Sequence, residues 1–408
     1  MAPRSDCAPR SADVAIVGGG IVGLAVAHAL QGRRPGLKVL VLEAEDAVCQ
    51  HQTGHNSGVI HSGLYYRPGS SKARLAVQGA RRIQAFCDEH ALPVQVCGKV
   101  VIATDDAEEG RLQTLLERGL ANGVPGLELV GPLRLVELQP GVAGQAALWV
   151  PGSAITDFSA VGRQLAKLVE AAGGEVRTGA RVDRVVRDGG DWVLGGTAGD
   201  FRAGFLVGCA GLHSDRLAAA AGQATDVRIV PFRGEYRVLA PSHAQSVHRL
   251  VYPVPDPGLP FLGVHLTPRL DGSVDVGPNA AMALSRRGYR RGVISVRDTL
   301  QTLMWPGFWR MAATHWSAAM GEELRYWSRS AMARNLRRMF PGVAGGDLAP
   351  GRAGVRAQAV RRDGALLDDF ELARSDAALH VLNAPSPAAT ASLAIGDEVA
   401  EAVLASLS

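Results

Sequence analysis

The chain has 408 residues, of which 47% are hydrophobic, a length that accommodates two or three domains with substantial cores. These values exclude a disordered tail and a small disulfide-stabilised scaffold. The 43 basic and 39 acidic residues give a formal net charge of +4, and the two signs are interspersed. Nucleic acid is therefore not an expected partner, whereas the mild positive excess suits a small acidic substrate.

Cysteine usage and hydropathy indicate a protein of a reducing compartment. The five cysteines form no Cys-x-x-Cys pair and leave one over, which favours reduced thiols. The apolar run at 14–30 resembles a signal peptide or a membrane span, but it contains four glycines and a histidine. It is also shorter than the roughly 20 residues that a span needs. We therefore expect a cytoplasmic protein without a spanning helix.

The first predicted elements form a strand, a glycine-rich turn and a helix. Residues 13–17 predict a buried strand that enters the turn GGGIVG, with GxGxxG spacing, and a helix through residue 30. The first glycine makes the tight turn, the second lets backbone approach a pyrophosphate at the helix N-terminus, and the third lets the helix pack on the strand. A second strand at 38–42 ends in an acid that can bind a ribose, which disfavours NADP but leaves NAD and FAD open. The expected dinucleotide contacts are Gly18, Gly20, Ile21, Val22, Gly23 and Glu43.

Polar residues are densest between residues 50 and 66. Three histidines there raise the question of a metal, but no Cys-x-x-Cys, His-Glu-x-x-His or close carboxylate accompanies them, so no metal site is expected. Hydroxyl, amide and imidazole groups can instead hydrogen-bond the phosphates and the ring of a cofactor. The alternative is a polar loop that caps its own turns. The candidate cofactor contacts are Thr53, His55, Asn56 and Ser57.

Small residues recur at the end of a later strand. After an expected helix at 157–172 and further strands, the apolar strand from residue 205 ends in Cys209, Ala210 and Gly211. This pattern resembles the second FAD-contacting motif of two-dinucleotide-fold flavoproteins, in which the chain passes close to the cofactor. It favours FAD over NAD, with Val182, Ala210 and Gly211 as contacts. Cys209 is expected to be a small buried residue rather than a nucleophile.

The order of these elements predicts an α/β protein with a Rossmann-like FAD-binding domain and a second, substrate domain. The cofactor motifs fall in three pieces, so the FAD-binding domain is expected to comprise 1–92, 143–226 and 350–408. The substrate domain then comprises 93–142 and 227–349. Strand patterns at 94–104 and 247–279 predict a mixed or antiparallel sheet over the cofactor, with the pocket where the domains meet.

Aromatic residues gather within segment 300–328. Trp305, Trp309, Trp316 and Trp327 follow a helical spacing that is interrupted at residues 306 and 307. Core packing between helices is one interpretation, and a surface that rests on a membrane is the other. The second interpretation would place the protein peripherally on the inner face of the cell membrane.

Longer motifs carry a more specific resemblance. They are ADVAIVGGGIVGLA, HQTGHNSGVIHSGLYY, PFRGEYRVL, VYPVPDPGLPFLGVHLTP, VGPNA, GVRAQ and LNAPSPAATASLAIG. From about residue 12 to residue 405, the chain resembles the L-2-hydroxyglutarate oxidase/dehydrogenase family of D-amino-acid-oxidase-like FAD oxidoreductases. The resemblance implies oxidation of L-2-hydroxyglutarate to 2-oxoglutarate, with electrons passed to oxygen or a quinone. The alternatives are a sibling amino-acid or amine oxidase and an NAD-dependent or non-catalytic dinucleotide-binding protein.

Two histidines lie in motifs for which the resemblance implies a catalytic role. The reaction moves a hydride from substrate C2 to flavin N5 while a base accepts the hydroxyl proton, and histidine suits that role. The first candidate is His61 in VIHSG. The second is His265 in GVHLTP, where strand alternation puts it on the face opposite Val264 and Leu266. Base, flavin or substrate contact, and packed core histidine remain open for these two residues.

The two substrate carboxylates call for guanidinium partners. Arg356 in GVRAQ and Arg233 in PFRGEY are the candidates, and a surface salt bridge is the alternative for each. Gln358 and Tyr66 complete the expected substrate site.

The C-terminal run at 383–396 is rich in small residues and precedes a helical stretch through residue 404. In the wider superfamily this region lies by the pyrimidine end of the flavin. The resemblance therefore adds Pro387, Ala388 and Thr390 to the expected cofactor contacts.

Overall fold

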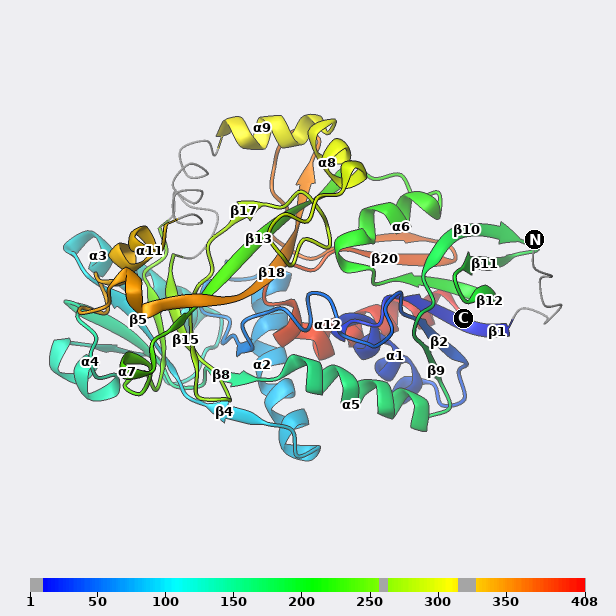
Figure 1. The fold of residues 1–408 in the computed structure, drawn as a ribbon. Coiled ribbons are helices and arrows are strands. Elements are labelled where there is room, and N and C mark those ends of the chain that lie inside the picture. The colour runs from blue at the N-terminus through cyan, green and yellow to red at the C-terminus, as the bar shows by residue number, and fades with distance from the viewer. Residues whose placement is uncertain (1–9, 257–262, 315–327, 408) are drawn as a thin grey trace.

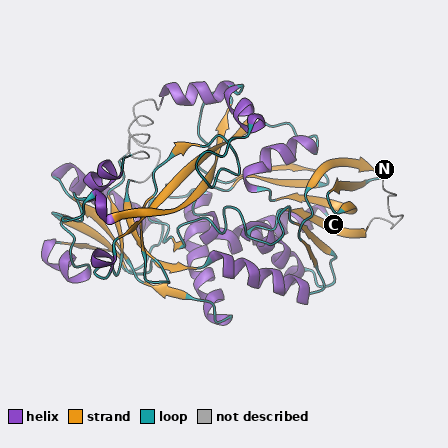
Figure 2. Cartoon of the chain, in the orientation of Figure 1, coloured by secondary structure: helices purple, strands orange, loops and turns teal. Residues whose placement is uncertain are grey.

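The computed structural model describes residues 10–256, 263–314 and 328–407. Two large β-sheets dominate the molecule, one near the chain termini and one at the opposite end (Figure 1). Figure 2 shows helices along both sheets and long loops between them. The mixed α/β fold expected from the sequence is confirmed.

The first sheet contains eight strands: β1 (Arg10–Val17), β2 (Val39–Leu42), β9 (Glu175–Arg177), β10 (Val182–Asp188), β11 (Asp191–Gly196), β12 (Gly199–Gly208), β19 (Glu371–Ser375) and β20 (Ala378–Asn383). Their order is β10-β11-β12-β1-β2-β9, with β20 beside β12 and β19 beside β20. The pairs β12–β1, β1–β2, β2–β9 and β12–β20 are parallel, as a Rossmann-like unit requires. The remaining pairs are antiparallel.

Helices cover both faces of this sheet (Figure 1). On one face lie α1 (Ile21–Arg33), α2 (Ser71–Glu89), α5 (Phe158–Ala171) and α12 (Ala388–Ser406); on the other lie η1 (Gly211–His213) and α6 (Ser214–Ala220). Alternation along β1 serves both layers, because Val14 and Ile16 belong to the core under α1 while Ala15 packs in the core that contains Leu217 of α6.

The second sheet contains nine strands: β5 (Lys99–Ala103), β6 (Glu128–Val130), β7 (Ala146–Val150), β13 (Val227–Leu239), β14 (Leu250–Pro253), β15 (His265–Pro268), β16 (Val274–Gly277), β17 (Ala281–Met282) and β18 (Leu348–Arg361). Their order is β17-β13-β16-β15-β14-β5-β7-β6, and β18 pairs with β13. The β14–β5 pair is parallel and the others are antiparallel, so the sheet is mixed, as expected.

Shorter elements complete the fold. A small sheet joins β3 (Val59–Ile60), β8 (Ala154–Thr156) and β4 (Val94–Val96). The helices beyond the first sheet are α3 (Asp106–Ala121), α4 (Pro132–Leu138), α7 (Pro241–Ala244), α8 (Val296–Leu303), α9 (Pro306–Thr314), α11 (Arg329–Leu336) and η2 (Gly345–Asp347). No helix within the described residues is both long enough and apolar enough to cross a membrane.

Two strands lie on the other side of the expected domain boundaries. β7 pairs with β5 and β6, and β18 pairs with β13 along most of its length, so both belong to the second sheet. The sequence boundaries put 146–150 and 350–361 with the cofactor-binding pieces. An apolar pattern specifies a strand but not its partner, and the long-range pairing decides the sheet. The division into two domains otherwise stays a prediction.

The C-terminal helix begins earlier than the sequence suggested. α12 starts at Ala388 rather than after residue 396, so most of the run of small residues is helical. Alanine has the highest helix propensity, and Pro387 stands at the N-cap, where its missing N–H costs no intrahelical bond. The start of α12 therefore reaches the edge of the cavity described below.

The tryptophan-rich segment is divided. α8 ends at Leu303 and α9 begins at Pro306, which matches the expected interruption. Trp305 is partly buried and donates to the Val360 carbonyl at 3.1 Å, whereas Trp309 is exposed. Trp316 and Trp327 lie outside the described residues.

Candidate functional site

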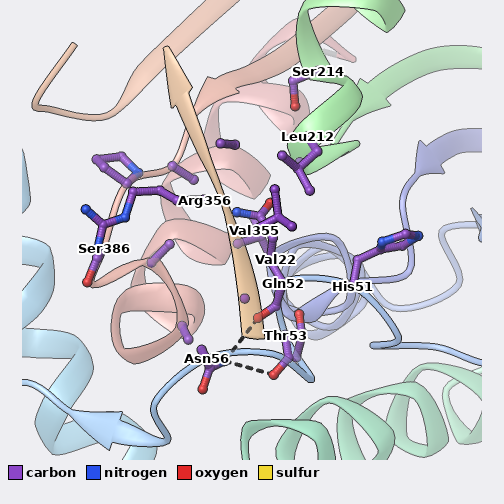
Figure 3. A pocket seen from close by; sticks show the side chains of 18 of the residues that line it. Val22, His51, Gln52, Thr53, Asn56, Leu212, Ser214, Val355, Arg356 and Ser386 are labelled. Atoms are coloured by element: carbon purple, nitrogen blue, oxygen red, sulfur yellow. Dashed lines mark hydrogen bonds between the residues drawn. The ribbon is translucent and has the colours of Figure 1, made fainter. Parts of the chain in front are cut away.

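A cavity of about 1380 Å³ lies between the two sheets, at the carboxyl ends of β1 and β2. Its walls come from the loop at 49–67, from β18 and from the start of α12; Figure 3 shows part of this lining. Ligands of open α/β sheets bind at the carboxyl ends of the strands. The volume exceeds the roughly 300–1,000 Å³ of most small-molecule pockets, which leaves room for a dinucleotide and a second molecule.

The glycine-rich turn forms one end of this cavity. Gly18, Gly20, Ile21 and Val22 line it. Gly18 has φ +119°, and a Cβ there would lie 2.2 Å from the Cys209 carbonyl oxygen, so only glycine fits. The position of Gly23 is different, since it is not among the described lining residues and instead packs α1 against the turn.

The acid at the end of β2 is buried and held in place. Glu43 accepts hydrogen bonds from the backbone N–H groups of Gly19 at 2.7 Å and Glu45 at 2.9 Å. Val182, Ala210 and Gly211 line the same part of the cavity. Burial raises the pKa of the Cys209 thiol to about 12, so this cysteine stays protonated, as an unreactive packing residue would.

Several polar side chains of the loop at 50–66 form hydrogen bonds with other groups of the protein. Asn56 donates to the carbonyls of Gln52 and Thr53 and accepts from the Gly58 N–H, and two of these bonds are drawn in Figure 3. Thr53 Oγ1 accepts from the Ile21 N–H at 3.1 Å. The interpretation of a loop that caps its own turns therefore describes Asn56, whereas Thr53 joins the loop to the first residue of α1. Both side chains line the cavity together with Ser57.

The histidines of this loop also have protein partners. His51 bonds Glu45 at 2.9 Å, and His55 bonds the Ala353 carbonyl of β18 at 3.0 Å and stacks on Tyr289. Within the described residues, no three His, Cys, Asp or Glu side chains are grouped as a metal ion would need.

The two candidate bases, His61 and His265, both line the cavity but differ in the hydrogen bonds of their rings. His265 is buried, its Nδ1 lies 2.8 Å from the Gly263 carbonyl, and its ring stacks on Tyr252 with centroids 3.9 Å apart. A carbonyl only accepts, so Nδ1 carries the proton and Nε2 keeps its lone pair. His61 donates its backbone N–H to Thr390 Oγ1, while its Nδ1 is buried without a partner in the described part of the chain.

Burial is the largest cause of a lowered pKa at both histidines. The charge of Lys99 adds to the effect at His61 and at His265. The pKa of His265 falls to about 4, so its imidazole is neutral at pH 7 and can accept a proton.

Arg356 is the arginine that reaches the cavity from the second sheet. It extends from β18 toward the side on which Ser386 lies (Figure 3). Its charge affects the pKa of both Tyr66 and His265, which line the cavity as well. Burial raises the pKa of the Tyr66 phenol, which therefore stays protonated and able to donate. Gln358 lines the cavity, but its amide donates to the Ala359 and Leu367 carbonyls.

Arg233 does not belong to the described cavity lining, which corrects its expected role. Its guanidinium forms a salt bridge with Glu235 at 2.8 Å and donates to the Gly288 carbonyl. In the β13–β18 register, Phe232 lies opposite Arg356 and Arg233 opposite Val355, so the two arginines point to opposite faces of the ribbon.

The start of α12 closes the cavity at the end away from Glu43. Pro387, Ala388 and Thr390 line it. Thr390 Oγ1 accepts from the His61 N–H and donates to the Val59 carbonyl, so it joins α12 to the polar loop. The positive end of this helix suits a negatively charged group.

Sequence reasoning missed several lining residues. Lys72 donates to Asp368 at 2.7 Å and lies over the Tyr66 ring, and both Tyr65 and Tyr252 face the cavity. The signals were weak, because a lysine at a helix start and a tyrosine in a Pro-rich strand are common on protein surfaces. Among the described residues, eight Lys or Arg and five Asp or Glu side chains line the cavity, a balance that favours an anionic ligand.

A valine at position 20 is expected to leave the fold intact and to weaken FAD binding at least about tenfold, as overpacking by methyl groups does. The backbone φ of Gly20 is −79°, which any residue adopts, and a Cβ would meet only Thr53 Oγ1, at 3.4 Å. The added methyl groups would therefore project into the space expected for the pyrophosphate. The measurement is the ratio of flavin to protein absorbance after purification.

The matched control is Gly32→Val, because Gly32 belongs to the same helix and a Cβ there meets nothing within 4 Å. A Gly20→Val protein with the flavin content of this control would contradict the placement of the cofactor.

Known proteins match this chain over nearly its whole length, including the residues that line the cavity. The family model described as FAD dependent oxidoreductase matches residues 13–402. The chain is 44% identical over 389 residues to L-2-hydroxyglutarate dehydrogenase of Indibacter alkaliphilus, a match that covers 95% of this chain and 98% of that protein. It is 42% identical over 392 residues to the Escherichia coli K12 protein of the same name, covering 96% and 93%. The human mitochondrial protein of that name is 42% identical over 410 residues, covering 96% and 89%.

Solved structures show the same fold at low sequence identity. L-alpha-glycerophosphate oxidase from Mycoplasma pneumoniae, with FAD bound, superimposes with a TM-score of 0.78 at 23% identity and covers 97% of this chain and 95% of that one. Glycine oxidase from Geobacillus kaustophilus gives a TM-score of 0.71 at 19% identity, with coverage of 97% and 95%. These likenesses concern the fold alone.

Proposed function

The chain belongs to the FAD dependent oxidoreductase family, and we propose that it oxidises L-2-hydroxyglutarate to 2-oxoglutarate. The observation that carries this proposal is the identity of 42–44% over nearly the full length with three proteins named L-2-hydroxyglutarate dehydrogenase. The cavity supports it, because His265, a neutral histidine, and Arg356 both line it from strands of the second sheet.

The residues present fit FAD. The N-terminus of α1 opens onto the cavity, where Gly18 allows the tight turn and Gly20 leaves room for a pyrophosphate, and the Glu43 carboxylate lies at the end of β2 for a ribose. Thr390 and the start of α12 stand at the opposite end for the ring system. Bound there, FAD supplies the electron-pair acceptor that amino-acid side chains lack.

His265 is the proposed base for the hydroxyl proton. Its Nδ1–H is engaged by Gly263, its ring is stacked on Tyr252, and Nε2 is the nitrogen left to accept a proton. The Nδ1 of His61 has no hydrogen-bond partner among the described residues, so this histidine is proposed as a wall residue beside the reacting carbon.

Arg356 is the proposed clamp for a substrate carboxylate, with the Tyr66 hydroxyl as an additional donor. Lys72, which bridges to Asp368, adds positive charge on the facing wall. Gln358 is proposed as a support of this wall, since its amide bonds backbone.

Anaerobic bleaching of the flavin tests the activity directly. L-2-hydroxyglutarate should bleach the visible absorbance of the purified protein, and the D-isomer and glycine should not. Bleaching by glycine or another amino acid instead would overturn the proposal in favour of an amino-acid oxidase.

The electron acceptor is proposed to be oxygen or a membrane quinone, and an exposed apolar segment supports the quinone. Ile294, Val296, Leu300, Met304 and Trp309 are all exposed around α8 and α9, and Met304 is 79% exposed. Basic residues stand nearby at Arg297 and Arg310. This combination is typical of a surface that rests on anionic lipid.

Met304→Glu is expected to lower co-sedimentation with anionic liposomes roughly tenfold. Burial of a methionine side chain in lipid contributes about 1.5–3 kcal/mol to binding, and a charged glutamate loses this contribution. The control is Leu133→Glu, which changes an 86% exposed residue of α4, at the lower left of Figure 1 and away from α8 and α9 along its upper edge. Wild-type protein that stays in the supernatant with anionic vesicles would contradict membrane contact.

A further inference from the structure

Lys99 is a fully buried lysine beside the cavity that the proposed mechanism does not use. It is the first residue of β5, between Val150 of β7 and Leu250 of β14, in a strand whose other four residues are apolar and buried. Within the described residues its Nζ has no hydrogen-bond partner. A buried ammonium without a counter-ion is costly, so its presence calls for an explanation.

Two aromatic rings that line the cavity lie next to the Lys99 ammonium. Nζ lies 4.6 Å from the centre of the Tyr252 ring and 5.0 Å from that of Tyr65, and both rings line the cavity. Tyr252 carries His265 stacked on its ring. Two aromatic faces offset part of the desolvation of the cation but supply no negative charge.

We propose that Lys99 is the buried counter-charge that makes this cavity select a dicarboxylate, and that its amine takes up a proton from solvent when the dianion binds. The inference rests on the proposed function. Lys99 is a positioning residue, because it is not among the described lining residues and its Nζ contacts the rings of Tyr65 and Tyr252, which are.

The titratable groups around Lys99 leave it as the one expected to change charge near neutral pH. Burial lowers the pKa of Lys99 to about 7. Burial also lowers the pKa of His61 and His265, which are neutral there, and raises the pKa of Tyr65, Tyr252 and the Cys97 thiol, which stay protonated. An anion in the cavity favours the charged form of Lys99, so binding and protonation support each other.

The test uses the FAD-loaded protein and glutarate, which has both carboxylates but no hydroxyl to oxidise. Binding is followed through the perturbation of the flavin spectrum, and proton uptake by calorimetry in buffers of different ionisation enthalpy. For the wild type we expect the Kd to rise by up to tenfold per pH unit above pH 7, with up to one proton taken up per glutarate. Lys99→Met should show a Kd about tenfold weaker at pH 6, no slope with pH and no proton uptake.

Valerate, with one carboxylate, measures selectivity, and its Kd should change much less in Lys99→Met than that of glutarate. Lys167→Met, an exposed lysine of α5, is the matched control and should behave as the wild type. Because methionine suits a buried apolar site, Lys99→Met should melt no lower than the wild type, which separates a binding effect from misfolding.

Two outcomes would overturn the inference: a Lys99→Met protein with the wild-type Kd and pH slope, or wild-type binding of glutarate without proton uptake. Neither outcome touches the proposed reaction, which flavin bleaching by L-2-hydroxyglutarate tests separately. Conversely, glutarate binding with proton uptake would uphold the role of Lys99 even if that bleaching failed.

Discussion

Replacement of Arg356 by lysine is expected to lower kcat/KM for L-2-hydroxyglutarate by roughly 10²- to 10³-fold, mainly through a higher KM. The guanidinium can hold a carboxylate through two parallel hydrogen bonds, which an ammonium cannot reproduce. Loss of a partner in a desolvated charge pair costs about 2–5 kcal/mol, and 1.4 kcal/mol corresponds to a factor of ten. Steady-state kinetics with the purified holoenzyme supplies the measurement.

Arg361→Lys provides the control for Arg356, because Arg361 is on the same strand but pairs with Asp226 outside the described cavity lining. It should stay within about twofold of the wild type, as partly exposed pairs contribute little. An Arg356→Lys enzyme that matches this control would refute the clamp.

Replacement of His265 by glutamine is expected to lower kcat by about 10²- to 10⁴-fold while KM changes little, since general-base catalysis contributes on that scale. Glutamine keeps a polar side chain of similar length but offers no nitrogen that gains a proton at neutral pH. The same substitution at His61 should cost less than tenfold. If His61→Gln proves the slower enzyme, the two roles are reversed, and if both keep wild-type turnover, no histidine serves as the base.

The pH profile gives the His265 proposal a second test. Burial, followed by the charges of Lys99 and Arg356, lowers its pKa to about 4 against the bond to Gly263. The imidazole is therefore neutral and able to accept a proton from pH 7 down to about pH 5. The value of kcat/KM should fall through protonation of this base only as the pH approaches 4. An acid limb centred near 6.5 would mean that the base has the pKa of an ordinary exposed histidine.

The sequence was most informative where chemistry depends on local spacing. The turn from Gly18 to Gly23 needs particular glycines a few residues apart, so its geometry follows from the sequence alone. The same holds for His265, whose alternation with Val264 and Leu266 correctly places it on the cavity side of β15.

What could not be predicted depends on contacts between distant segments. Arg233 and Arg356 look alike in sequence, and only the register of β13 against β18 separates the arginine that lines the cavity from the one that pairs with Glu235. Lys99 gave no signal either, because a lysine at the start of a strand ordinarily ends in solvent. Its burial follows from the Tyr65 and Tyr252 rings that cover it, from two other parts of the chain.

The strand β18 limits how this enzyme could be redesigned. It carries Arg356 and, a few residues earlier, Ala353, whose carbonyl forms a hydrogen bond with the His55 ring. The neighbouring Gly354 also packs tightly on the loop, because a Cβ there would lie 2.4 Å from the His55 carbonyl oxygen. A shift of β18 that changed the position of Arg356 would therefore also displace the loop at 50–66, which lines the cavity expected to hold the cofactor. Engineering of substrate range is better directed at Lys72 of α2, a lining residue whose side chain can be exchanged without moving this strand.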